Sequence, residues 1–297
     1  MADTTADAFG QDPITTVTKR PMNKTLRRLL RDWAALVGAA ILLLLSLATL
    51  LAPWILPYGF AEVVAFPFEP ASTQFWLGTD EIGRDIFTRI IYGARVSLTV
   101  GFVSTSIALA GGIPLGLISG YRGGVIDTVL MRLMDMMFAF PAIILALAII
   151  AVLGPNLLNA MIAIGVMQIP LFARLVRGNT LALKNQDYVQ AAIAAGAGMT
   201  RILTFHILPN TMSAIMVQFT LTFASAVLIE AALSFLGLGV APPTPSWGAM
   251  LDTGRKLITI SPLYSVSAGA AIFVTVLGLN LVGDALRDAL DPRMVDA

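Results

Sequence analysis

The sequence predicts an all-α integral membrane protein with six transmembrane helices. Composition is the first reason: 57% of the 297 residues are hydrophobic and 12% are charged, whereas soluble domains are about 45–50% apolar and about 25% charged. The second is a series of long runs without Asp, Glu, Lys or Arg, since a helix needs roughly 20 apolar residues to cross the hydrocarbon core. The third is the uneven distribution of Lys and Arg between alternate connecting segments.

The charge-free runs place the six spans in order along the chain. Their expected positions are 33–56, 96–121, two spans within 136–173, roughly the first 30 residues of 207–251, and one span within 257–283. The run at 136–173 is too long for one helix, and Gly154-Pro155-Asn156 divides it at a tight turn.

Small residues recur along the second span. Gly112, Gly116, Gly120 and Gly124 are each four residues apart, so a neighbouring helix can approach their backbone closely. We favour tight packing within the bundle over a hinge at these positions.

The Lys and Arg residues predict which side of the membrane each segment occupies. Six spans put both termini on one side. If that side is the cytoplasm, all but five of the 19 Lys and Arg residues lie inside, as the positive-inside rule requires. The five outside are Arg84, Arg89, Arg95, Arg255 and Lys256. We therefore predict a multi-pass protein of a bacterial or archaeal plasma membrane with both termini cytoplasmic.

The same pattern divides the chain into segments. Residues 1–23 are polar and lack the apolar core and cleavage site of a signal peptide, so we expect a disordered cytoplasmic tail. Residues 24–57 combine a basic amphipathic lead-in with the first span. The remaining segments are an external loop at 58–92, a five-helix core at 93–290 with a cytoplasmic loop at 182–209, and a cytoplasmic C-terminus at 291–297.

The loop between the fourth and fifth spans is the most informative segment. A chain that only crosses the membrane has no need of so long a patterned loop, whereas a chain that receives force from a soluble partner does. The loop reads as two short helices: Asp187 can cap the first and Gly196 breaks it. Thr200 can cap the second, and Pro209 ends the unit. The expected result is a compact knob at the membrane surface.

This loop resembles the EAA loop of ATP-binding-cassette importer permeases. Gln190-Ala191-Ala192, Gly196 and Leu208-Pro209 keep the spacing of that motif, with Gln190 in place of its Glu and His206 in place of its Ile. Both departures are similar to the peptide-permease branch. In that family the loop is a coupling helix that docks into a groove on the ATPase subunit. The resemblance implies ATPase coupling by Asp187, Tyr188, Gln190, Ala191, Ala192, Gly196, Arg201, His206 and Pro209.

Two further segments, 75–101 and 231–248, resemble the C-type subunit of dipeptide and oligopeptide permeases. The first contains Gly83-Arg84-Asp85 within a cluster of charged residues. We expect this cluster to form structural ion pairs that order the external loop and cap the second span, rather than to contact substrate. Its members are Asp80, Arg84, Asp85 and Arg89.

Glu230 is the only ionisable residue deep inside a predicted span. A carboxylate in lipid is costly, so Glu230 should face the bundle interior or a water-filled path. Two interpretations stay open for it: part of an external gate or translocation path, or a buried, hydrogen-bonded partner of a neighbouring helix. Two interpretations also stay open for Trp247, which lies in a proline-rich outer loop. It is either part of that gate, where a substrate-delivering protein docks, or an anchor at the membrane interface.

The resemblance covers residues 24–293 and implies a type I importer transmembrane subunit that forms half of a pathway for di- or oligopeptides. The implied partners are a homologous second permease subunit, two ATPase subunits that bind ATP and Mg²⁺, an external solute-binding protein, membrane lipid and the peptide.

Several functions are not expected of the chain itself. It has no Gly-Lys dipeptide and hence no P-loop. With one His and no Cys it has no metal site of its own. We therefore expect no enzyme activity and no cofactor or metal in this chain. A net charge of +1 gives no indication of nucleic-acid binding.

Three alternatives stand beside this interpretation. Within the same importer class, the substrate could be glutathione or a nickel complex, since selectivity resides largely in the binding protein. From another class, a stand-alone proton-coupled secondary transporter could use Glu230 as a relay, although no inverted repeat is obvious. A membrane scaffold that transports nothing is the third.

Overall fold

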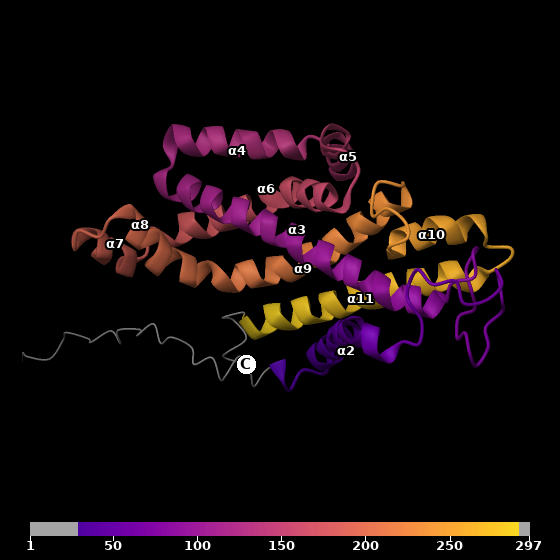
Figure 1. Cartoon of the computed structure of the whole chain (residues 1–297). Helices are drawn as coiled ribbons and strands as arrows, with labels where there is room; N and C mark the ends of the chain where they lie inside the picture. Colours follow the sequence, from indigo (N-terminus) through magenta and orange to yellow (C-terminus); the bar gives the residue numbers. More distant parts are fainter. Residues whose placement is uncertain (1–28, 291–297) are drawn as a thin grey trace, which may run out of the picture.

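The computed structural model describes residues 29–290, which are built from helices (Figure 1). Within these residues no segment forms an extended strand, which confirms the all-α class. The predicted tail at 1–23, the lead-in at 24–28 and the C-terminus at 291–297 lie outside the described residues. The helices are α2 Trp33–Ile55, α3 Ile86–Arg122, α4 Gly124–Phe138, α5 Ala142–Leu153, α6 Leu157–Leu183, α7 Asp187–Ala194, α8 Met199–Arg201, η1 Ile202–Ile207, α9 Leu208–Phe235, α10 Trp247–Lys256 and α11 Pro262–Leu290.

Within the described part of the chain, five helical segments are long and apolar enough to cross a membrane. They are α2, α3, α6, the continuous segment Met199–Phe235 and α11. The turn predicted at Gly154 is present, with a φ of +91°. Beyond it Asn156 caps α6 by accepting a hydrogen bond from the backbone N–H of Asn159 at 2.8 Å.

The predicted third span is not a straight helix. α4 and α5 meet at a bend of 93°. α5 has only 12 residues, about 18 Å at 1.5 Å per residue, which is short against a hydrocarbon core of about 30 Å. Pro141 lies at the bend, where it donates no backbone hydrogen bond and disfavours helical geometry at Phe140. α4 and α5 make a sixth membrane crossing only if the two are counted together as one broken helix.

Two boundaries also differ from those predicted. α3 begins at Ile86 rather than at 96, because Asp85 accepts a hydrogen bond from the backbone N–H of Thr88 and caps the helix. The loop predicted at 58–92 therefore ends at 85, and the core predicted to begin at 93 begins with α3.

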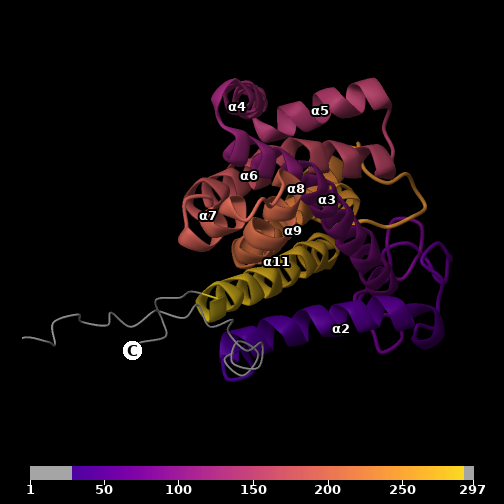
Figure 2. The same cartoon turned by 90° about the vertical axis from the view of Figure 1, so that its left-hand side faces the viewer.

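The helices form an elongated bundle with two different ends (Figure 1). α3 packs along α6 and α9, and α11 packs against both α9 and α2. α2 lies on the outside of the bundle, with most of its surface exposed (Figure 2). We call the end that carries α7 and α8 the knob end, and the end that carries residues 56–85 and α10 the loop end.

Three of the four predicted glycines allow α3 and α6 to approach closely. A Cβ atom on Gly116 would lie 2.5 Å from the carbonyl oxygen of Ala173 in α6. Gly112 and Gly120 meet the same helix in the same way. Gly124 does not: it begins α4, has a φ of +57°, and has no atom within 4 Å of its Cβ position. Tight packing is therefore confirmed at three positions and wrong at the fourth.

Candidate functional site

The knob, residues 187–207, consists of α7, α8 and the π-helical segment η1. Asp187 lies in the first turn of α7 and does not cap it, since Gln186 holds that position. α8 begins at Met199, so Thr200 does not cap the second helix. Both predicted caps are wrong because the residues at the cap positions, Gln186 and Gly198, lie one and two residues before the expected ones. A carboxylate in the first turn of α7 is still favourable, since the backbone N–H groups there carry partial positive charge.

Gly196 ends α7, as predicted. Its φ is +82°, in the left-handed region that residues with a Cβ rarely adopt. Across the break the backbone N–H of Ala197 donates to the carbonyl of Ala192 at 3.0 Å. No atom lies within 4 Å of the Cβ position of Gly196, so backbone geometry rather than crowding requires glycine here.

Pro209 does not end the knob, contrary to the prediction. It lies in the first turn of α9, and Met199–Phe235 is one continuous helical segment. Proline has no N–H, and its ring crowds the carbonyl four residues earlier. The turns before it widen into η1, where the N–H of Leu208 donates to the carbonyl of Leu203. The knob therefore joins α9 without a break.

One face of the knob is anchored and the other is exposed. Val189, Ile202 and Ile207 are buried in an apolar cluster with Phe172 and Val176 of α6. The exposed side chains include Tyr188, Gln190, Ala191, Ile193 and Phe205. Apolar side chains exposed beside polar ones suit contact with another protein.

Polar side chains hold α7 to η1 and to the end of α6. Asn210 Nδ2 donates to the carbonyl of His206 at 2.6 Å and to the Tyr188 hydroxyl at 3.3 Å. Partial burial raises the pKa of Tyr188 above its ordinary value. Gln190 Nε2 donates to the carbonyl of Lys184 at 2.8 Å. All nine predicted coupling residues thus lie on the knob or at its junction with α9.

At the loop end, the predicted ion pairs are buried and centre on Asp80. Its Oδ2 lies 2.6 Å from Arg84 Nε and 3.4 Å from Arg89 Nε, and all three side chains are at most 8% exposed. Arg89 Nη1 also donates to the carbonyl of Phe60 at 3.0 Å, which fixes the start of the loop on α3. Asp85 is wrongly predicted as a member. Its carboxylate forms no ion pair within residues 29–290, but it caps α3, which confirms that the cluster caps the second span.

Glu230 lies where three helices meet. Its side chain is buried, and its carboxylate accepts hydrogen bonds from Ser97 Oγ of α3 at 3.0 Å and from Ser234 Oγ of α9 at 2.7 Å. Beside it α10 packs closely on α9, since a Cβ atom on Gly248 would lie 2.2 Å from the carbonyl oxygen of Ala231. Of the two open interpretations, this geometry fits the buried partner of neighbouring helices.

Trp247 is fully buried, which excludes the interfacial anchor, one of the two interpretations left open for it. Its indole Nε1 donates to the carbonyl of Ile90 at 2.9 Å. Gly93 makes room for the ring, since a Cβ atom there would lie 3.0 Å from Trp247 Cδ1. Neither Trp247 nor Glu230 lines an open surface in this conformation.

With this geometry in view, comparison with known proteins identifies the family. The family model of the binding-protein-dependent transport system inner membrane component matches residues 112–296, which is more than half of the chain. The chain belongs to this family. Residues 20–71 of the permease also match the N-terminal transmembrane domain of oligopeptide transport permease C.

Curated relatives match the permease over nearly its whole length. The dipeptide transport system permease protein DppC of Alkalihalophilus pseudofirmus is 46% identical over 92% of this chain and 90% of its own. The glutathione transport system permease protein GsiD of Pectobacterium atrosepticum is 42% identical, and that of Shigella dysenteriae is 45% identical, each over 93% of this chain and 92% of its own. The family and the apolar helices make the chain a multi-pass inner membrane permease.

Sequence reasoning missed two ion pairs of the permease between α4 and α6. Arg177 Nε lies 2.5 Å from Asp127, and Arg174 Nη2 lies 2.5 Å from Asp135. Spacing along a helix favours pairs three or four residues apart, and these partners are 50 and 39 residues apart. Among the described residues, no three His, Cys, Asp or Glu side chains gather as they would around a metal ion.

Replacing Glu230 separates a structural role from a role in the transport path. Glu230→Ala should lower stability by about 1–3 kcal/mol, because buried serine hydroxyls lose their acceptor. Glu230→Gln keeps an acceptor oxygen and should lose less than half as much. Thermal unfolding of the detergent-solubilised protein measures both. Two variants as stable as the wild type, with transport lost in each, would instead favour the gate or path.

Proposed function

We propose that the permease forms half of the translocation pathway of an ATP-driven importer for di- or oligopeptides. Its family supplies the membrane component of binding-protein-dependent transport, and the name of the dipeptide permease relative at 46% identity supports a peptide substrate. Glutathione, named for two relatives, is itself a modified tripeptide and is the second candidate. The partners in this proposal are a homologous second permease, two ATPases that bind ATP and Mg²⁺, and an external solute-binding protein.

The continuous helix from the knob into α9 is the observation that carries the coupling mechanism. A force applied to the exposed face of the knob acts on one helical segment, Met199–Phe235, which reaches Glu230 and the loop end. The Lys and Arg distribution favours a cytoplasmic knob and cytoplasmic termini. Closure of the ATPases then favours one global state of the permease and their opening favours the other, because the partners bind the two states with different affinity.

The exposed Ala191 on α7 gives a direct test. Ala191→Glu adds length and charge to the face proposed to dock the ATPase but fills no buried space. We expect at least about tenfold weaker ATPase association, equivalent to about 1.4 kcal/mol, and a matching loss of ATP-driven peptide uptake. Co-purification of tagged ATPase and uptake into proteoliposomes measure the two effects.

The matched control is Ala61→Glu, the same change at an exposed position of the loop end. It should leave ATPase association unchanged. Normal association and uptake in Ala191→Glu would contradict the proposal. So would peptide uptake by this chain alone in liposomes with a pH gradient, which would favour a secondary transporter.

A further inference from the structure

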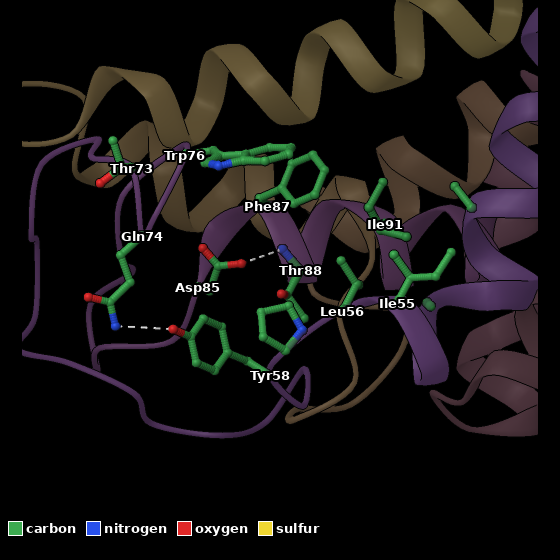
Figure 3. A pocket seen from close by; sticks show the side chains of 13 residues that line it. Ile55, Leu56, Tyr58, Thr73, Gln74, Trp76, Asp85, Phe87, Thr88 and Ile91 are labelled. Atoms are coloured by element: carbon green, nitrogen blue, oxygen red, sulfur yellow. Dashed lines mark hydrogen bonds between the residues drawn. The ribbon is translucent and has the colours of Figure 1, made fainter.

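A cavity of about 450 Å³ lies at the loop end between α2, α3 and the loop that joins them. Its walls come from the last turns of α2, from residues 56–58, 73–76 and 85 of the loop, and from the first turns of α3 (Figure 3). Most of the lining is apolar or aromatic, including Ile55, Trp76, Phe87 and Ile91. Its volume suits a small ligand or one part of an amphiphile.

Two buried polar atoms in this lining lack partners. Asp85 Oδ1 and Thr88 Oγ1 have no hydrogen-bond partner within residues 29–290, although Asp85 is 5% and Thr88 is 1% exposed. The other oxygen of Asp85 accepts from the backbone N–H of Thr88 at 2.8 Å, and this cap fixes the direction of the carboxylate. A buried carboxylate oxygen without a donor is costly. The cavity therefore favours an occupant with N–H donors and positive charge.

Figure 3 shows the Asp85 carboxylate in the middle of the lining, between Trp76 on one side and Tyr58 on the other. The Tyr58 hydroxyl accepts a hydrogen bond from Gln74 Nε2 at 3.1 Å, and it makes no hydrogen bond to Asp85 Oδ1. An occupant must therefore bring its own donor to Asp85 and Thr88.

The surroundings indicate that the occupant enters from the lipid phase. Ala48, Ala52 and Ile55 of the exposed helix α2 form one wall. Trp76, which lines the cavity, is 64% exposed, and Trp54, one residue before the lining residue Ile55, is 77% exposed. Tryptophan is enriched at the depth of the lipid head groups. The cavity thus lies where a lipid places its polar head next to its apolar chains.

We propose that this cavity binds a phospholipid with a primary ammonium head group, phosphatidylethanolamine, from the leaflet at the loop end. The ammonium donates to Asp85 Oδ1 and Thr88 Oγ1, and the apolar part of the lipid lies against Ile55 and Phe87. The bound lipid bridges α2 to α3 at a site distinct from the knob and from Glu230. The proposal depends on neither the transported substrate nor ATPase coupling.

Native mass spectrometry of the purified complex with lipids of identical acyl chains tests the site. Phosphatidylcholine carries the positive charge without an N–H donor, and phosphatidylglycerol carries no cation. We expect phosphatidylethanolamine to be retained about tenfold better than either, as a charge-assisted hydrogen bond to a buried carboxylate implies.

Three variants should abolish that preference by different routes. Asp85→Asn keeps the helix cap but presents N–H donors to the ammonium. Thr88→Val removes the hydroxyl at nearly constant volume. Ala48→Phe fills the cavity without touching either polar group. The control Asp252→Asn removes a partly exposed carboxylate of α10, which pairs with Lys256 at 2.6 Å, and should keep the preference.

Equal retention of the three lipids by the wild type would overturn the proposal. An unchanged preference in folded Asp85→Asn or Ala48→Phe, judged by elution and melting temperature, would overturn it as well. If instead Asp85→Asn weakens binding of the solute-binding protein while no lipid preference exists, a basic side chain of that protein is the occupant and the lipid site is wrong. Because lipid retention is measured without transport, failure here leaves the proposed import function intact.

Discussion

Gly116→Leu should prevent α3 and α6 from packing and leave little folded permease. The Cβ atom alone would lie 2.5 Å from the carbonyl oxygen of Ala173 and 2.7 Å from Val176 Cβ. A backbone carbonyl in a helix cannot rotate away, so the two helices must separate along their contact. Overpacking of a core costs about 1–3 kcal/mol and occasionally more, and we expect this change to cost about 3 kcal/mol or more.

Size-exclusion chromatography of the heated, detergent-solubilised protein measures the loss as a fall in the folded fraction. Gly178 is the matched control, because it lies on α6 with no atom within 4 Å of its Cβ position and an ordinary φ. Gly178→Ala should be neutral or slightly stabilising, since alanine favours a helix by up to about 1 kcal/mol over glycine. Similar loss in both variants would show that close approach at Gly116 is not the cause.

Asp80→Ala should produce the second large effect, a loss of about 3–5 kcal/mol in the free energy of unfolding. The change leaves Arg84 and Arg89 buried with no carboxylate from Asp80 between them. It also removes the acceptor of the backbone N–H of Arg84 at 2.9 Å. Loop 56–85 should then detach from α3, which limited proteolysis and the melting temperature both detect.

Asp80→Asn separates charge from hydrogen bonding, because the amide oxygen can still accept one bond while the negative charge is lost. Its effect should fall between those of the wild type and Asp80→Ala. Asp252→Asn should change stability by less than about 1 kcal/mol, since exposed ion pairs contribute little. A wild-type melting temperature for Asp80→Ala would show that the buried ion pairs do not hold the loop.

Local features of the sequence were predicted most reliably. The break at Gly196 and the turn at Gly154 both have a positive φ. Glycine adopts this conformation easily because it has no Cβ, so the residue type alone indicates it. The packing of Gly112, Gly116 and Gly120 was predictable because their four-residue spacing puts them on one face of a helix. Gly124 broke the series because the chain turns at Gly123, which no spacing rule detects.

The errors concern residues whose role depends on distant partners. Trp247 was expected to contact lipid or a partner protein. It is instead buried in the bundle, where Gly93, 154 positions earlier in the chain, leaves room for its ring. Asp85 was expected to pair with arginines, and the backbone N–H of Thr88 takes its carboxylate instead. Pro209 was expected to end the knob, and the wide turn of η1 accommodates it within a continuous helical segment.

The sequence by itself determined that this chain is an all-α membrane permease of its family. It also determined roughly where the apolar spans lie along the chain and where the knob lies. These properties follow from the transfer free energy and backbone freedom of each residue. Only the tertiary structure decided which apolar residues face protein and which face lipid, that α4 and α5 bend, and that Glu230 is held by serines of α3 and α9. Hydropathy is the same for a residue buried against a helix and one exposed to lipid, so it cannot distinguish α2, with 17% of its most apolar stretch buried, from α6, with 61%.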